Sequence, residues 1–317
     1  MLMAMRKYFV HIYIVFALCL VGIVVGSFFD FQISDSLYQI GGRADKFGLT
    51  ISVLGAIPGF VVVSFIGGGF LAFGLKRDFA DIKNKKTNLF LRILMFVLAA
   101  ASYGLSVYFT GREFFGLNGF QYPDMKLHYG YFIAAPIDLL AFFVGYVVNK
   151  KTTNKKLWVY YLLFIVVLAI ALLGFISLIK IIDYRPRFRS LGTVEGLNYH
   201  NWWSPFKNHK TYLALGVPKE EFKSFPSGHA AYCVIPMMFA FFLPLINKNY
   251  KKYVLPLFYA GLIWLLLVAF SRIYVGAHFL SDVSMGALLV AVSFFILNIV
   301  IDNNKYLSLE ELDTVAD

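Results

Sequence analysis

Eight stretches of apolar residues, each about as long as a membrane is thick, constrain this chain more than any other feature. They lie near residues 8–29, 51–74, 89–110, 129–148, 157–179, 229–247, 253–272 and 279–301. A helix needs roughly 20 apolar residues to cross the hydrocarbon core, and the first stretch is too long for the core of a signal peptide. The chain of 317 residues is also 59% hydrophobic and only 15% charged. These features predict an all-α, polytopic membrane helix bundle with about eight transmembrane helices.

The charges between the apolar stretches predict the orientation of the helices. Lysine-rich connections lie near 76–86, 150–156 and 248–252, and Arg6 and Lys7 precede the first stretch. The positive-inside rule places these segments and both termini in the cytoplasm. The connections near 180–228 and 272–278 then face the extracytoplasmic side. The net charge of +11 is expected to reflect topology in a multi-pass plasma-membrane protein, not binding to nucleic acid.

A few residues inside the apolar stretches are open to different interpretations. Asp138 is a carboxylate within the fourth stretch, and it is either a functional group or a polar contact inside the bundle. The glycines at 55, 59 and 67–69 favour close packing of the second helix on a neighbour. Cys19 and Cys233 predict neither a disulfide framework nor a zinc cluster. No cofactor is expected.

A basic cluster, KIIDYRPRFR, begins at Lys180 and ends the fifth stretch on its outer side. Seven residues separate Lys180 from Arg187, which is close to two helical turns and would place both cations on one face of an unbroken helix. Pro186 argues against an unbroken helix. The cluster is either part of an anion site or a basic collar at the membrane surface, with snorkelling side chains.

The sequence FPSGH, from Phe225 to His229, lies where the long outer connection enters the sixth stretch. Pro226 and Ser227 are typical of a helix start, and Gly228 lets an anion approach the free N–H groups at the positive end of the helix dipole. His229 can give or take a proton near neutral pH. A capped helix start with an interfacial histidine is the other interpretation.

The third cluster, SRIYVGAHFLSD, runs from Ser271 to Asp282 between the last two stretches. It contributes a further cation, Arg272. A spacing of four residues places His278 and Asp282 on one helical face, where the carboxylate can hold one ring nitrogen and leave the other free to attack.

All three clusters fall on the same predicted side of the membrane. A metal site made of the two histidines and Asp282 is less favoured than an anion site, because Lys180, Arg187 and Arg272 would repel a metal ion. The combination therefore suits a bound anion better than a metal ion.

These clusters resemble the three motifs of the type 2 phosphatidic acid phosphatase (PAP2) superfamily, which also includes the vanadium haloperoxidases. The second and third clusters fit that family in every defining letter. The first family motif is a lysine, six variable residues and then Arg-Pro, whereas Phe188 follows Arg187 in this chain. Pairing Arg185 with Pro186 would require a lysine at Leu178, so Lys180 with Arg187 is the preferred assignment.

The resemblance implies a mechanism. His278 would attack phosphorus and form a phosphohistidine, Asp282 would orient it, and His229 would protonate the leaving alkoxide. The phosphoryl oxygens would be held by the remaining motif residues, which are Lys180, Arg187, Ser227, Gly228 and Arg272. A lipid phosphate would be the substrate.

The resemblance covers about residues 157–301 and predicts a catalytic transmembrane domain there. Residues 1–156 would form an N-terminal transmembrane region of unassigned role, and residues 302–317 a short acidic cytoplasmic tail. Three other functions fit the same pattern: a lipid-linked phosphotransferase, a transporter or flippase that uses Asp138, and a haloperoxidase. The sequence predicts neither the particular lipid nor the oligomeric state.

Overall fold

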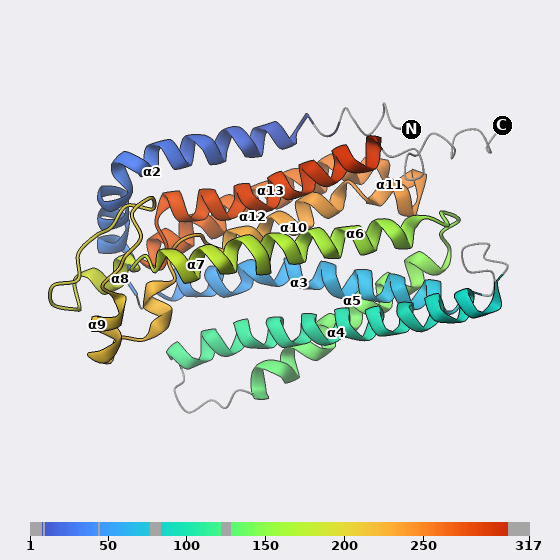
Figure 1. The fold of residues 1–317 in the computed structure, drawn as a ribbon, viewed down its shortest axis with the longest axis horizontal. Helices are drawn as coiled ribbons and strands as arrows, with labels where there is room; N and C mark the ends of the chain where they lie inside the picture. Colours follow the sequence, from blue (N-terminus) through green and yellow to red (C-terminus); the bar gives the residue numbers. More distant parts are fainter. Residues whose placement is uncertain (1–7, 9, 44, 77–83, 122–127, 304–317) are drawn as a thin grey trace.

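The computed structural model describes residues 8, 10–43, 45–76, 84–121 and 128–303. All regular elements among these residues are helices, and seven helices are long and apolar enough to cross a membrane. They lie side by side along the long axis of the molecule (Figure 1). The protein is therefore an integral, multi-pass membrane protein with an all-α bundle fold, as the sequence predicts.

The spanning helices are α2 (Ile12–Ile40), α3 (Lys46–Gly74), α4 (Lys85–Gln121), α5 (His128–Lys150), the continuous run α6 (Leu157–Ala169), η2 (Ile170–Ile176) and α7 (Ser177–Asp183), then α12 (Val254–Tyr274) and α13 (Leu280–Asn303). The shorter helices are α8 (Phe188–Leu191), α9 (His209–Ala214), η3 (Lys219–Phe222), α10 (Gly228–Ala240), α11 (Leu243–Ile246) and η4 (Lys248–Tyr253). The segment η2 is a π-helical turn, and η3 and η4 are 3₁₀ helices.

The eighth expected span, 229–247, is not one long helix. It is divided into α10, with 13 residues, and α11, with four, and Pro244 stands in the first turn of α11. Proline cannot continue a helix without losing a backbone hydrogen bond, although it fits well in a first turn. The short α10 lies among α3, α12 and α13, and most of its side chains are buried.

Helix α3 packs against α4, α5, α10 and α12, and its glycines allow this close approach. A Cβ atom at Gly68 would lie 1.9 Å from the carbonyl oxygen of Phe142 on α5. A Cβ atom at Gly59 would lie 2.6 Å from the carbonyl oxygen of Tyr232 on α10. The prediction that the glycines of this helix serve packing is therefore confirmed for these two positions.

The two ends of the bundle differ in character. At one end, the lysine-rich connections contact each other: Lys76 Nζ donates to the carbonyl oxygen of Thr152 at 2.9 Å, and Thr152 Oγ1 donates to that of Ile246 at 3.0 Å. The opposite end carries α8, α9 and the starts of α10 and α13 (Figure 1). The three motif clusters therefore lie together, at the end away from these lysines, as the charge pattern predicts.

The long connection between α7 and α10 packs onto this end of the bundle. Leu197, Phe206 and Phe222 form a small buried apolar cluster within it. Trp202 donates a hydrogen bond from Nε1 to Ser27 Oγ of α2 at 3.0 Å, whereas Trp203 is 52% exposed. The aromatic side chains of this connection are therefore divided between its buried interior and its surface.

The expected division of the chain at 156 and 301 stays a prediction. Most of the expected acidic tail, from 304 onward, lies outside the described residues.

The α3–α5 contact generates a matched pair of alanine substitutions. Gly68→Ala places a methyl group against backbone atoms of α5, which have little freedom to move, so we expect a loss of about 1–3 kcal/mol. Gly104→Ala on α4 meets no atom within 4 Å and improves helix propensity. The apparent Tm in detergent should fall for Gly68→Ala and stay or rise for Gly104→Ala. Equal melting temperatures would contradict the packing role.

Candidate active site

The first motif cluster is broken by a sharp change of backbone direction. Helix α7 ends at Asp183, and Tyr184 adopts a left-handed conformation with φ 50°. Lys180 therefore stays on α7, whereas Arg187 stands at the N-terminus of the short α8. The two cations do not share the face of one unbroken helix, in agreement with the argument from Pro186.

The third motif cluster forms a tight turn between α12 and α13. The N–H groups of Ala277 and His278 both donate to the carbonyl oxygen of Arg272, at 3.0 and 3.1 Å. Gly276 has φ 65°, a conformation that side chains with a Cβ atom rarely adopt. The turn holds Arg272 and His278 close together at the site end.

Lys180, Arg187 and Arg272 form a group of positive charges around His278, and all three act on its imidazole electrostatically. The Nε atoms of Arg187 and Arg272 are buried and have no hydrogen-bond partner among the residues that the structure describes. Buried donors are normally paired, because an unpaired one costs free energy. These two N–H groups can bind the oxygens of an anion.

Another arginine of the same segment is paired with an opposite charge. Burial would raise the pKa of Glu221, but hydrogen bonds from Arg189 and Ser190 lower it to about 2. Arg189 binds both carboxylate oxygens of Glu221, at 3.0 and 2.7 Å. The charge of Arg189 is therefore balanced within the connection.

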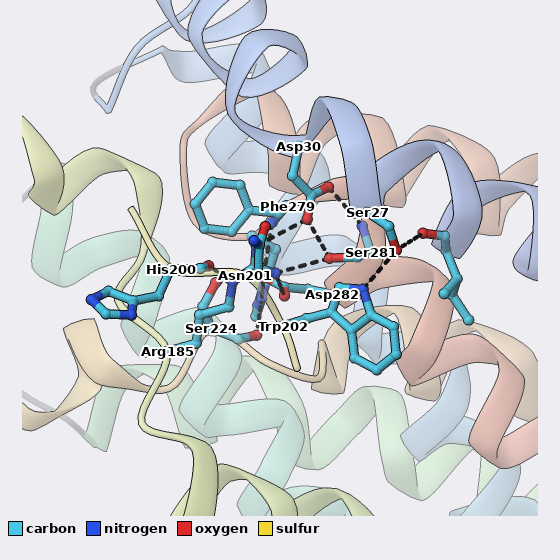
Figure 2. A network of polar contacts seen from close by, with 12 residues as sticks. Ser27, Asp30, Arg185, His200, Asn201, Trp202, Ser224, Phe279, Ser281 and Asp282 are labelled. Atoms are coloured by element: carbon cyan, nitrogen blue, oxygen red, sulfur yellow. Dashed lines mark hydrogen bonds and ion pairs between the residues drawn. The ribbon is translucent and has the colours of Figure 1, made fainter. Parts of the chain in front are cut away.

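Arg185 is fully buried between two carboxylates (Figure 2). Its Nη1 lies 2.5 Å from Asp282 Oδ1, and its Nη2 lies 2.9 Å from Asp30 Oδ2 on α2. Ser281 donates hydrogen bonds to Asp30 from its N–H and its hydroxyl group. Arg185 is thus a structural link between three segments, and this geometry supports the choice of Arg187 for the anion site.

His278 is held by a backbone carbonyl group. Its Nδ1 lies 2.6 Å from the carbonyl oxygen of Ser224 and 3.7 Å from Asp282 Oδ2. A carbonyl oxygen can only accept, so Nδ1 carries the proton and the neutral ring has its lone pair on Nε2. Burial lowers the pKa of His278 well below its usual range, against the opposing effect of Asp282. The ring is therefore neutral and has a free nucleophilic nitrogen.

The expected contact between His278 and Asp282 is present at 3.7 Å, but the carbonyl oxygen of Ser224 is the nearer partner of Nδ1, at 2.6 Å. The oxygens of Asp282 are occupied by Arg185, by Ser224 Oγ at 2.5 Å and by the N–H of Phe279 at 2.8 Å. Asp282 fixes Ser224, and the carbonyl group of Ser224 in turn holds the ring. The carboxylate of Asp282 therefore orients His278 indirectly, through Ser224.

The second motif cluster begins α10, as expected. Ser227 is its N-cap residue, and its hydroxyl oxygen accepts from the N–H of Ala230 at 3.5 Å. The N–H of Ser227 donates to the carbonyl oxygen of Asp282 at 2.9 Å, which joins the starts of α10 and α13. Gly228 is the first residue of α10, at the positive end of its dipole.

His229 lies in the first turn of α10 and is paired with a carboxylate that the sequence analysis does not include. Its Nε2 lies 3.1 Å from Oε2 of Glu113 on α4, and the two side chains are 19% and 14% exposed. Arg272 and Lys180 also act on His229 electrostatically. The two histidines thus share neighbouring cations and differ in their hydrogen-bond partners.

The structure brings the predicted residues of all three motifs to one end of the bundle, although their chemical roles stay predictions. Asp30, Glu113 and Ser224 lie outside the three sequence motifs. A charged residue near the end of an apolar stretch is the only sequence signal for Asp30 and Glu113. Asp138 lies on α5, between the helices, and its Oδ1 accepts a hydrogen bond from Ser106 on α4 at 2.5 Å.

Comparisons with known proteins relate the C-terminal half of the chain to a known family. Residues 158–306 match the family model of the PAP2 superfamily. Phosphatidylglycerophosphatase B of Bacillus subtilis (strain 168) is 43% identical over 79 residues, which cover 23% of this chain and 36% of that protein. The match therefore spans little more than a third of the relative's length. No solved structure matches the chain.

The three motif clusters lie within the residues that match the family model, and they lie together at one end of the bundle (Figure 1). We conclude that residues 158–306 belong to the PAP2 superfamily.

Proposed function

We propose that this protein is a membrane phosphatase that hydrolyses a phosphate or diphosphate monoester of a lipid-like substrate. The observation that carries the proposal is the pair of buried Nε–H groups of Arg187 and Arg272, which have no hydrogen-bond partner within the described residues and which belong to cations that act on His278. The phosphatidylglycerophosphatase relative and the family match support this class of reaction.

The cations suit the charge of a phosphoryl group. Lys180, Arg187 and Arg272 are held by the fold before substrate binds, so little reorganisation is needed when negative charge develops on the phosphoryl oxygens. The hydroxyl group of Ser227 and the N–H of Gly228 lie at the start of α10 and add neutral donors. Each donor of this kind typically contributes about 10²–10³-fold to the rate.

The two histidines divide the chemistry. Nε2 of His278 forms a bond to phosphorus while the bond from phosphorus to the leaving oxygen breaks, and His229 gives that oxygen a proton. His229, now neutral, then takes a proton from the water that attacks the phosphohistidine. The second step releases inorganic phosphate and restores both histidines.

An apolar cavity favours a lipid-like leaving group. The cavity, of about 130 Å³, lies between α3, α4, the α6–η2 run and α10. Among its lining residues, Tyr232 lies one helical turn from His229, and Phe109 lies one turn from Glu113. Leu173 also lines it and is 68% exposed, so the cavity borders the membrane-facing surface. A hydrocarbon chain can therefore lie beside the proposed proton donor.

The reaction should depend on the two histidines in different ways. Purified protein in detergent should release inorganic phosphate from one or more of phosphatidate, phosphatidylglycerophosphate, polyprenyl diphosphate and lipid A phosphate. His278→Ala should abolish release from both lipid and nitrophenyl esters. His229→Ala should lower lipid turnover by about 10²–10⁴-fold and spare the nitrophenyl ester, whose leaving group needs little protonation.

His11→Ala is the matched control, because His11 pairs with Tyr259 at the start of α12, away from the site. Phosphate release that required an added acceptor would identify a phosphotransferase. Lipid movement that survived His278→Ala, without any phosphate release, would indicate a transporter and contradict the proposal.

We also propose that the site faces the extracytoplasmic side, on the strength of the lysine-rich connections at the other end of the bundle. Lys151 and Glu195 are exposed at opposite ends, and the native Cys19 and Cys233 are buried. In intact cells, an impermeant thiol reagent should label Glu195→Cys, and it should label Lys151→Cys only after the membrane is permeabilised. The reverse pattern would invert the topology.

A further inference from the structure

The contact between His229 and Glu113 joins the PAP2 region to a helix outside it. Glu113 lies on α4, which ends well before residue 158, where the family match begins. Its carboxylate oxygen is 3.1 Å from His229 Nε2, and both side chains are mostly buried. Burying a charged carboxylate costs free energy unless the charge is paired. We therefore expect His229 to compensate the charge of Glu113.

The contact fixes which nitrogen of His229 carries a proton. A carboxylate oxygen can only accept a hydrogen bond, so the proton of the shared bond belongs to Nε2. No contact to Nδ1 of His229 is found within the described part of the chain. A second proton, on Nδ1, would therefore be the one available to a substrate.

The two histidines are held in opposite ways. His278 donates from Nδ1 to the carbonyl group of Ser224, which carries no charge and leaves Nε2 free to attack. His229 faces a carboxylate through Nε2, which favours an imidazolium and leaves Nδ1 free to donate. Environments that separate two titratable groups in this way define an acid and a nucleophile.

The surroundings of His229 disfavour a positive charge on its ring, and a nearby carboxylate offsets part of that effect. Burial lowers the pKa of His229, Arg272 from α12 and Lys180 from α7 lower it further, and Glu113 opposes these effects. On α13, Asp282 is already paired with Arg185, and α3 has no charged residue after Lys46. Arg112 on α4 and Arg272 also act on Glu113 electrostatically. Glu113 is thus the carboxylate that offsets the cations around His229.

We propose that Glu113 is a positioning residue that holds Nε2 of His229 and favours its imidazolium form, so that Nδ1 can donate to the leaving oxygen. This inference rests on the proposed phosphatase function and extends its site to the N-terminal region. The substrate it implies is a phosphate ester with a poor, alkoxide-type leaving group, because a good leaving group needs no proton.

Glu113→Gln tests the charge while it keeps a hydrogen-bond acceptor. For the lipid phosphate, kcat/KM should fall about ten- to a hundredfold. The alkaline limb of its pH–rate profile should move about one unit to lower pH, because the imidazolium loses its counter-ion. Turnover of nitrophenyl phosphate should fall much less. Glu113→Asp keeps the charge and should retain the alkaline limb of the wild-type protein. Glu195→Gln removes an exposed carboxylate at the same end and should change neither substrate's profile.

A double-mutant cycle separates positioning from general support of the fold. In a His229→Ala background, Glu113→Gln should cause no further loss, since the group through which it acts is gone. An equal loss in both backgrounds, or an unchanged pH limb in Glu113→Gln, would overturn the inference and leave the phosphatase proposal standing. If the wild-type protein released no phosphate from any lipid, both would fail.

A measurement on the unsubstituted protein covers the case in which Glu113→Gln does not fold. Nitrogen-15 spectra of protein labelled at histidine, assigned by the signal lost in His229→Ala, report which ring nitrogen is protonated. We expect a proton on Nε2 of His229. An unprotonated Nε2 at neutral pH would overturn the inference.

Discussion

The guanidinium group of Arg185, buried between Asp30 and Asp282, is the interaction on which the arrangement of the site depends. Its carbon also lies 4.1 Å from the centre of the Phe279 ring, so it contacts an aromatic face as well as two carboxylates. Removing one partner from a buried ion pair typically costs about 3–5 kcal/mol, because a charge is left unpaired. The network therefore holds α2, the segment after α7 and the start of α13 in one geometry.

That geometry determines the state of the proposed nucleophile. Asp282 accepts from Ser224 Oγ, and the carbonyl group of Ser224 accepts from His278. Each contact fixes the orientation of the next group in this series. The direction of the free Nε2 of His278 therefore depends on Arg185 and Asp282, which lie on segments distant in the sequence. The site is thus pre-organised, and positively charged donors surround a neutral imidazole, which is the condition for electrostatic stabilisation of a phosphoryl transition state.

Local patterns predict the elements and the motif residues, because they depend on residues close together in the chain. Apolar stretches identify the long helices, and Ser227 and Gly228 identify the start of α10. The partners of those residues are not predictable in this way. Asp30 and Ser281 are 251 residues apart, and Glu113 and His229 are 116 apart. Such pairs depend on how helices are rotated and shifted against one another, and a lone carboxylate near the end of an apolar stretch does not reveal its partner.

The preference for Arg187 over Arg185 illustrates the same limit. Both cations lie in one short segment, and spacing alone separates them weakly, whereas burial between two carboxylates gives Arg185 a structural role. The contribution of the N-terminal helices to the site is equally hard to predict from local sequence patterns. They lie outside the family match, yet α2 and α4 supply Asp30 and Glu113 to the candidate site, so the proposed catalytic arrangement also depends on these two helices.

The central claim is that His278 attacks phosphorus inside a pocket of fixed positive charge. Rapid quenching of purified protein during turnover of a lipid phosphate, followed by peptide mass spectrometry under alkaline conditions, tests it most directly. The account predicts an acid-labile phosphate on the peptide that contains His278, and none on the peptide that contains His229. A phosphorylated His229, or steady turnover without any phosphohistidine, would contradict it.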